Sequence, residues 1–170
     1  MQNLELKARY HDLEKAAELA ETLGATHEWT RQQIDIYFRV PAGKLKLRCV
    51  NGHDAELIAY QRPAVADAKV SDYIVHSEKN ADSLERVLSH ILPVEARIVK
   101  QRTLYLWNNV RIHLDHVEQL GVFIEFEAVL GKAEDVTASR QRIEFLSTHF
   151  AIQKKNLVTV GYFELLKDVI

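Results

Sequence analysis

The chain has 170 residues, of which 47% are hydrophobic and 27% are charged, so it carries enough apolar side chains to fold around a core of its own. Its 22 Lys and Arg residues against 24 Asp and Glu residues give a formal net charge of -2, which argues against a global attraction to DNA or to an anionic membrane. The single cysteine, Cys49, excludes an intrachain disulfide and a cysteine-based zinc site.

The organisation of the sequence predicts a single domain over residues 1–170. We find no internal repeat, no low-complexity segment and no linker rich in proline, glycine or serine. The first residues lack the basic run and apolar stretch of a signal peptide, and no apolar run reaches the roughly 18 residues of a membrane span. We therefore expect a cytoplasmic protein in a reducing compartment.

Strands dominate the predicted secondary structure. Period-two alternation of apolar and polar residues predicts about eight of them, over residues 2–10, 27–40, 44–51, 55–62, 69–76, 94–107, 109–117 and 121–130. Helical spacing predicts amphipathic helices around residues 13–23, 84–91 and 136–150, with a short final helix around 162–166. Asp12 is a plausible N-cap of the first helix, and Asn51-Gly52 predicts a hairpin turn. Short connections between most strands favour an antiparallel sheet that is curled or closed.

The predicted strands have one apolar side and one charged side. In the first strand Leu4 and Leu6 alternate with Glu5 and Lys7, and later strands repeat this pattern. The commonest explanation is a sheet with one solvated face. Two observations favour a closed barrel with its charges inside: the helices need the apolar faces as a surface to cover, and the charges are segregated. Carboxylates lie on the first and last strands and bases on the middle strands, so closure creates an acidic corner in a basic tunnel.

Such a tunnel predicts a specific kind of ligand. Charges enclosed in excess are costly unless they are paired or bound. Converging lysines and arginines suit phosphate oxygens, and neighbouring carboxylates suit hard cations such as Mg²⁺ or Mn²⁺. The expected fold is thus α+β and mainly antiparallel β, an eight-stranded closed barrel with flanking helices around a metal–polyphosphate site.

Several segments in this order resemble the CYTH family of triphosphate tunnel metalloenzymes, which includes class IV adenylate cyclases and thiamine triphosphatases. The matching segments are Asn3-Leu4-Glu5-Leu6-Lys7, Gln33-Ile34-Asp35-Ile36-Tyr37-Phe38, Leu45-Lys46-Leu47-Arg48, Tyr60-Gln61-Arg62-Pro63, Lys69-Val70-Ser71-Asp72-Tyr73, Val99-Lys100-Gln101-Arg102, Arg111-Ile112-His113-Leu114-Asp115 and Gly121-Val122-Phe123-Ile124-Glu125-Phe126-Glu127. Each segment is weak alone, but their order over nearly the whole chain is specific. Within this family the chain resembles bacterial class IV adenylate cyclase-like proteins in particular.

The resemblance implies a role for each charged residue. The phosphates of the substrate are expected on Lys7, Lys46, Arg48, Arg62, Lys69, Lys100, Arg102 and Arg111. The metal, Mg²⁺ or Mn²⁺, is expected on Glu5, Asp115, Glu125 and Glu127. Catalysis is expected to depend on Glu5, Lys7, Lys100 and Arg102. The chain departs from the family at Asn3, where the signature Glu-x-Glu-x-Lys has its first glutamate.

Three functions fit this resemblance. The first is a class IV adenylate cyclase, which converts ATP to cyclic AMP and pyrophosphate. The alternative is a triphosphatase acting on inorganic tripolyphosphate, thiamine triphosphate or a nucleoside triphosphate. The second alternative is a non-catalytic receptor for a nucleotide or polyphosphate, with Asn3 as the mark of lost chemistry. The expected partner is therefore a small triphosphate molecule, with no role for DNA or membrane, and the chain could form a homodimer.

Other polar residues have two interpretations each. Asp35 either orients a base of the tunnel or is a solvated acid near a strand end. Trp29 either stacks on an organic base or packs at the barrel rim. His113 is interpreted as a polar neighbour of Asp115 and not as a zinc ligand, because His116 lies on the opposite strand face.

Overall fold

The structure is a computed structural model that describes residues 2–52, 54–61, 69–131, 136–167 and 169. These residues form eight strands: β1 (Gln2–Arg9), β2 (Thr26–Phe38), β3 (Lys44–Val50), β4 (Asp54–Gln61), β5 (Lys69–Glu78), β6 (Val94–Trp107), β7 (Val110–Val117) and β8 (Gly121–Leu130). Their helices are α1 (Leu13–Thr22), α2 (Ala81–Ile91), α3 (Val136–His149), α4 (Tyr162–Lys167) and a 3₁₀ turn, η1 (Lys154–Asn156). No helix in this part of the chain is both long and apolar enough to cross a bilayer.

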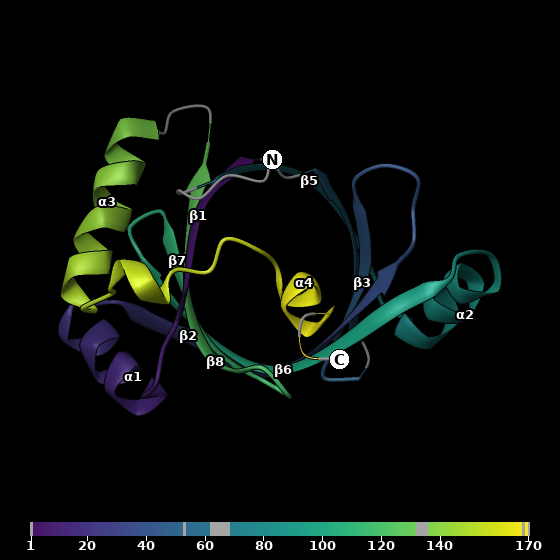
Figure 1. Ribbon diagram of the computed structural model, residues 1–170, viewed down its shortest axis with the longest axis horizontal. Helices are drawn as coiled ribbons and strands as arrows, with labels where there is room; N and C mark the ends of the chain where they lie inside the picture. The colour runs from purple at the N-terminus through teal and green to yellow at the C-terminus, as the bar shows by residue number, and fades with distance from the viewer. Residues whose placement is uncertain (1, 53, 62–68, 132–135, 168, 170) are drawn as a thin grey trace.

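The eight strands close into a barrel in the order β1-β5-β4-β3-β2-β6-β7-β8, which is the ring seen in Figure 1. All neighbouring strands are antiparallel. β1 completes the ring, because it pairs with β8 along its whole length and with β5 over Gln2–Glu5. The predicted closed antiparallel barrel is confirmed.

Local sequence signals account for the turns and the first helix. The backbone amide of Lys15 donates to the Asp12 carboxylate at 2.9 Å, which confirms Asp12 as the N-cap of α1. Asn51 and Gly52 both have positive φ, 50° and 80°, as a tight hairpin between β3 and β4 requires. The N-terminal turn of α2 was not predicted: it begins at Ala81, capped by Asn80, three residues before the predicted stripe.

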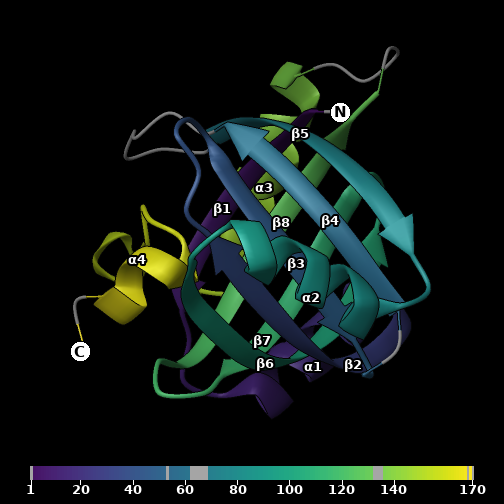
Figure 2. The same ribbon diagram turned by 90° about the vertical axis from the view of Figure 1, so that its right-hand side faces the viewer.

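The apolar faces of the strands point outward and are covered by the helices. α1 and α3 lie against the β1, β7 and β8 side of the barrel, whereas α2 lies on the opposite side near β3 (Figures 1 and 2). α1 and α3 bury a cluster that includes Leu4, Ile112, Phe126 and Leu146, each 0% exposed. Each such side chain contributes about 1.5–3 kcal/mol when buried. This outer packing is what turns the charged faces inward.

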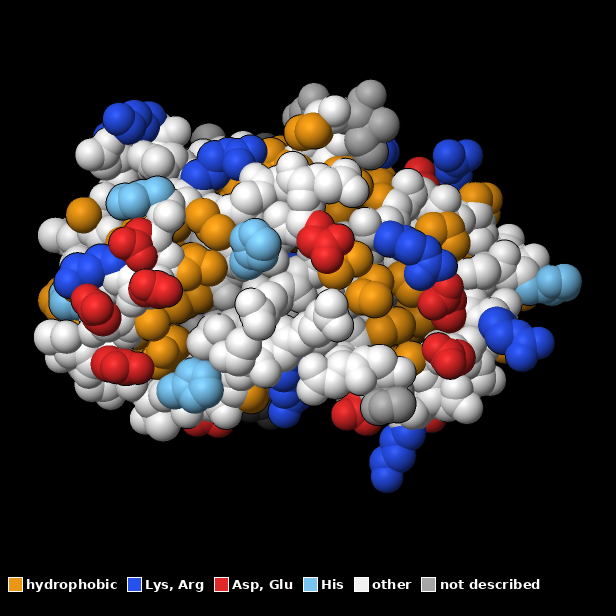
Figure 3. All heavy atoms as spheres, turned by 90° about the horizontal axis from the view of Figure 1, so that it is seen from below, with side chains coloured by type: hydrophobic (Ala, Val, Ile, Leu, Met, Phe, Trp, Pro, Cys, Tyr) orange, Lys and Arg blue, Asp and Glu red, His pale blue; other side chains and the backbone are white. Residues whose placement is uncertain are grey.

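α4 lies across one end of the barrel, as both ribbon views show (Figures 1 and 2). The Phe163 ring stacks on Tyr37, and the Tyr162 ring meets Phe123 edge-on, with centroids 5.1 and 5.0 Å apart. The Lys44 ammonium forms an ion pair with Glu164. Acidic and basic side chains are interspersed on the face of the molecule in Figure 3.

Candidate functional site

The barrel encloses a cavity of about 650 Å³, and all eight strands contribute inward-pointing side chains to its wall. The structure brings together nine of the predicted site residues around this space: Glu5, Lys7, Lys46, Arg48, Lys100, Arg102, Arg111, Glu125 and Glu127. The charged side chains that alternate with apolar ones along these strands therefore point into an enclosed lumen and not toward a solvated outer face.

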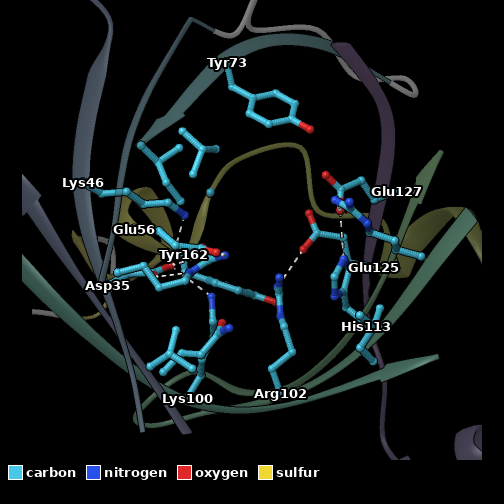
Figure 4. Close-up of a pocket in the computed structure, with 18 of the residues that line it drawn as sticks. Asp35, Lys46, Glu56, Tyr73, Lys100, Arg102, His113, Glu125, Glu127 and Tyr162 are labelled. Carbon is cyan, nitrogen blue, oxygen red and sulfur yellow. Dashed lines mark hydrogen bonds and ion pairs between the residues drawn. The ribbon is translucent and has the colours of Figure 1, made fainter. Parts of the chain in front are cut away.

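A buried carboxylate organises the basic part of the lumen (Figure 4). Asp35 on β2 is 1% exposed and accepts from three cations on two neighbouring strands. Lys46 Nζ lies 3.1 Å from its Oδ2, Lys100 Nζ lies 3.0 Å from the same oxygen, and Arg48 Nε lies 2.7 Å from its Oδ1. The register explains the convergence, since Asp35 is directly opposite Arg48 on β3. Asp35 thus orients the tunnel bases, as one of its two interpretations states.

Burial and neighbouring charges shift the pKa values of this cluster. Burial alone would raise the pKa of Asp35, but Arg48, Lys100 and Lys46 hold it well below its usual value. Burial lowers the pKa of Lys46 to about 8, and Arg48 adds to the shift. Burial and the Arg102 charge also lower the pKa of Lys100 well below its ordinary value. Three basic side chains therefore share one carboxylate, so the cluster attracts any further anion that enters the lumen.

Arg102 connects the basic cluster to the acidic wall. Its guanidinium binds Asp115 with two hydrogen bonds, of 2.6 and 2.5 Å, and donates to Glu125 Oε2 at 3.0 Å. The Tyr162 hydroxyl donates to Asp115 Oδ2 at 2.7 Å, so α4 is tied to the same carboxylate. Burial raises the pKa of Asp115, but Arg102 more than offsets this and lowers it to about 2. Asp115 is 0% exposed and lies behind Arg102, outside the cavity lining.

The acidic wall is formed where β1 meets β8. Glu5 lies directly opposite Glu127 in this strand pair, and both side chains line the cavity. Lys7 lies opposite Glu125, with 3.6 Å between Nζ and Oε1. Like charges directly opposite each other on one sheet face are destabilising, so the Glu5–Glu127 pair favours a cation between or beside its carboxylates.

Glu127 also interacts with side chains on both neighbouring strands, β1 and β7. It accepts from the Asn3 amide, from His113 Nε2 at 3.0 Å and from Arg111 Nη1 at 3.5 Å. Burial raises the pKa of Glu127, but the hydrogen bond and charge of His113, with Arg111, lower it to about 2. Burial and Arg102 lower the pKa of His113.

The acidic wall fits a hard divalent cation by the chemistry of its donors. Glu5, Glu125 and Glu127 present carboxylate oxygens to the lumen, the ligands that Mg²⁺ and Mn²⁺ prefer. Within the described part of the chain, no three His, Cys, Asp or Glu side chains converge closely enough to hold a metal by themselves. Magnesium is typically held by one or two carboxylates plus substrate phosphates, so an opposed pair beside a phosphate site is sufficient.

Two predicted phosphate contacts lie outside what the structure describes. Arg62 is among residues 62–68, and the side chain of Lys69 is likewise outside the described part, although its backbone pairs with Glu5. Tyr162 was not predicted as part of the site, yet it lines the cavity, with Lys7 Nζ 4.2 Å from its ring centre. No periodic pattern marks it, because it begins a six-residue helix. Gln33 was also missed, although its alternation with Asp35 on β2 was a usable signal.

The fold and the site together define a closed antiparallel barrel whose tunnel is lined by lysine and arginine side chains on one part and by carboxylates on another. The family comparison agrees: residues 1–162 match the CYTH domain, so the chain belongs to the CYTH family. A search of curated proteins finds no sequence match.

Solved structures share this fold at low sequence identity. The PH1012 protein of Pyrococcus horikoshii OT3 is 20% identical, with a TM-score of 0.85 over 96% of this chain and 98% of its own. A candidate adenylate cyclase from Vibrio parahaemolyticus is 19% identical, with a TM-score of 0.81 over 97% of both chains. HpAC1 from Hippeastrum, described as having a dominant triphosphatase activity, is 18% identical, with a TM-score of 0.59 over 95% of this chain and 91% of its own.

Proposed function

We propose that this chain is a divalent-metal-dependent enzyme that cleaves a P–O–P bond of a triphosphate held in the barrel lumen. The observation that carries the proposal is the opposed Glu5–Glu127 pair, which lines the same cavity as four buried or half-buried bases around Asp35 and Asp115. A lumen of this composition offers separate places for phosphate oxygens and for a hard cation.

The bases would bind and orient the phosphates. The Asp35 carboxylate is contacted by Lys46 and Arg48 from β3 and by Lys100 from β6. An arginine side chain can bind two phosphate oxygens at once. Lys7 and Arg111 are placed beside the acidic wall, where they would neutralise phosphate close to the cation site. Asp115 and Tyr162 are best interpreted as positioning residues, since both act on the geometry of Arg102. Enclosure in the lumen strengthens each of these interactions.

The cation would be held by Glu5 and Glu127, with Glu125 beside them. When bound, Mg²⁺ or Mn²⁺ supplies charge neutralisation of the phosphate oxygens and activation of the attacking hydroxyl group. Two reactions share this arrangement. In an adenylate cyclase the 3′-hydroxyl of ATP attacks the α-phosphorus and pyrophosphate leaves. In a triphosphatase water attacks the terminal phosphorus, the diphosphate part of the substrate leaves, and the attacked phosphoryl group becomes orthophosphate; this is the activity named for the fold neighbour HpAC1.

Product analysis tests the proposal. The purified chain is incubated with ATP or with tripolyphosphate, with Mg²⁺ or Mn²⁺, at neutral and alkaline pH. Cyclic AMP with pyrophosphate identifies the cyclase, and orthophosphate identifies the triphosphatase. Glu5→Gln is expected to lower either rate at least about 100-fold, while the exposed control Glu118→Gln leaves it unchanged.

Two other outcomes contradict parts of the proposal. Tight triphosphate binding with no product from any combination supports the non-catalytic receptor and overturns the enzyme. Unchanged triphosphate binding in both Lys100→Ala and Arg102→Ala overturns the assignment of the lumen itself.

A further inference from the structure

Two polar atoms in the lumen wall lack hydrogen-bond partners. Among the buried side-chain nitrogen and oxygen atoms of the described residues, only Gln33 Oε1 and His113 Nδ1 are unpartnered. Gln33 is 4% exposed and His113 is 5% exposed, and both residues line the cavity. A buried polar atom without a partner is destabilising, so both atoms favour a ligand that supplies the missing hydrogen bond.

The two atoms lie on either side of Arg102. Gln33 on β2 is directly opposite Lys100, and His113 on β7 is directly opposite Leu104, so Arg102 lies between these two pairs on β6. The neighbouring donors are already directed elsewhere. Lys100 donates to Asp35, and Arg102 donates to Asp115 and Glu125. The wall itself therefore leaves these two positions unsatisfied.

Both unpartnered atoms are hydrogen-bond acceptors. A carboxamide oxygen only accepts. The Glu127 carboxylate can only accept from His113 Nε2, so this contact places a hydrogen on Nε2, and the matching tautomer leaves a lone pair on Nδ1. Ionised phosphate oxygens are acceptors too, so phosphate cannot satisfy either atom. The partner must be an O–H or N–H group.

An apolar surface adjoins these acceptors. Trp29 lies directly opposite Leu104, which in turn lies opposite His113, so the three side chains form one row across β2, β6 and β7. The Arg31 guanidinium lies 4.7 Å from the centre of the Trp29 ring. Val50, beside Gln33 on β3, extends the apolar lining. A ring-containing organic group could pack here while its donors reach the acceptors.

We propose that Gln33 and His113 form a recognition site for hydrogen-bond donors on the organic part of the substrate, with Trp29 and Leu104 as its apolar seat. The inference rests on the proposed function, because it takes the phosphates to lie on the bases nearby. The recognition site predicts that the substrate is a triphosphate ester whose organic part carries hydroxyl or amino groups, and not inorganic tripolyphosphate.

The test measures the affinities of three probes by calorimetry in the presence of Mg²⁺: ATP, methyl triphosphate and tripolyphosphate. The chain is expected to bind ATP more tightly than the two probes without such donors. Gln33→Leu should reduce the ratio of ATP affinity to tripolyphosphate affinity by about five- to tenfold, the value of one neutral hydrogen bond. His113→Leu should reduce the same ratio, in which any general loss of phosphate binding cancels. The matched control Gln32→Leu, on the exposed face of the same strand, should leave it unchanged.

Stability provides an independent readout. Gln33→Leu removes an unsatisfied buried group, so its unfolding midpoint in urea should equal or exceed that of the parent chain. An unchanged affinity ratio in both lumen variants overturns the recognition site while leaving the proposed function intact. Failure of the parent chain to bind any of the three probes overturns the proposed function instead.

Discussion

The Asn3 side chain bridges Tyr73 and Glu127 across the acidic end of the lumen. Its amide donates to Glu127, and its carbonyl oxygen accepts from the Tyr73 hydroxyl at 3.2 Å. Asn3 occupies the position where the family signature has a glutamate, so this amide takes the place of a charge. Its donor group partly neutralises Glu127, which a carboxylate at the same position would repel.

Asn3→Glu is expected to raise the affinity for Mn²⁺ by about tenfold, because ligand charge tunes cation binding. Without metal the same variant should unfold at a lower temperature than the parent chain, since three carboxylates then share one corner. Thermal melting with and without Mn²⁺ measures both effects, and Asn3→Gln serves as the uncharged control. If Asn3→Glu has the same stability and the same Mn²⁺ affinity as the parent chain, Asn3 does not lie at the cation site.

Replacing Asp35 by asparagine should destabilise the barrel by about 3–5 kcal/mol, because Lys46, Arg48 and Lys100 lose the carboxylate they share. Tripolyphosphate should restore more stability to this variant than to the parent chain, since phosphate supplies the missing negative charge. Urea unfolding with and without tripolyphosphate measures the two quantities. The exposed Asp54→Asn is the matched control. An equal ligand effect in both chains would show that the three bases do not bind phosphate.

The affinity for tripolyphosphate should fall as the pH rises through about 8. The pKa of Lys46 is lowered to about 8, so its ammonium is charged below that pH and is progressively lost above it. An anion then loses one of its cations. Lys46→Arg keeps its charge over this range, so its affinity should fall less between pH 7 and 9 than that of the parent chain. Calorimetry across this range checks the prediction, which fails when both chains show the same slope.

The sequence was sufficient for the barrel and for most of the lumen. Strict alternation on β1 and β8 places Glu5, Lys7, Glu125 and Glu127 on one face, because side chains in a strand have period two. Their inward direction was predicted because the helices need an apolar surface to cover, which leaves the charged faces to point inward. The cluster around Phe126, on the outside of the barrel beneath the helices, confirms this prediction.

Contacts between distant strands could not be predicted in the same way. Asp35 meets Lys100 across 65 residues, and alternation alone left its role open between a buried organiser and a solvated acid. Arg102 and Asp115 meet because they lie directly opposite each other in the β6–β7 pair, a register that the periodicity of a single strand does not encode. Tyr162 reaches the lumen through the docking of a short helix, so only the tertiary packing of α4 reveals it.

The first strand, β1, closes the ring, so the barrel cannot close until the later strands β5 and β8 are available to pair with it. β1 carries Asn3 and Glu5, but its partner Glu127 lies on β8, and Asn3 and Glu127 are 124 residues apart in the chain. The corner proposed to hold the cation therefore cannot assemble until β8 has left the ribosome. Contacts of such long sequence separation make folding slow, so β1 remains an unpaired edge in the nascent chain until β5 and β8 emerge.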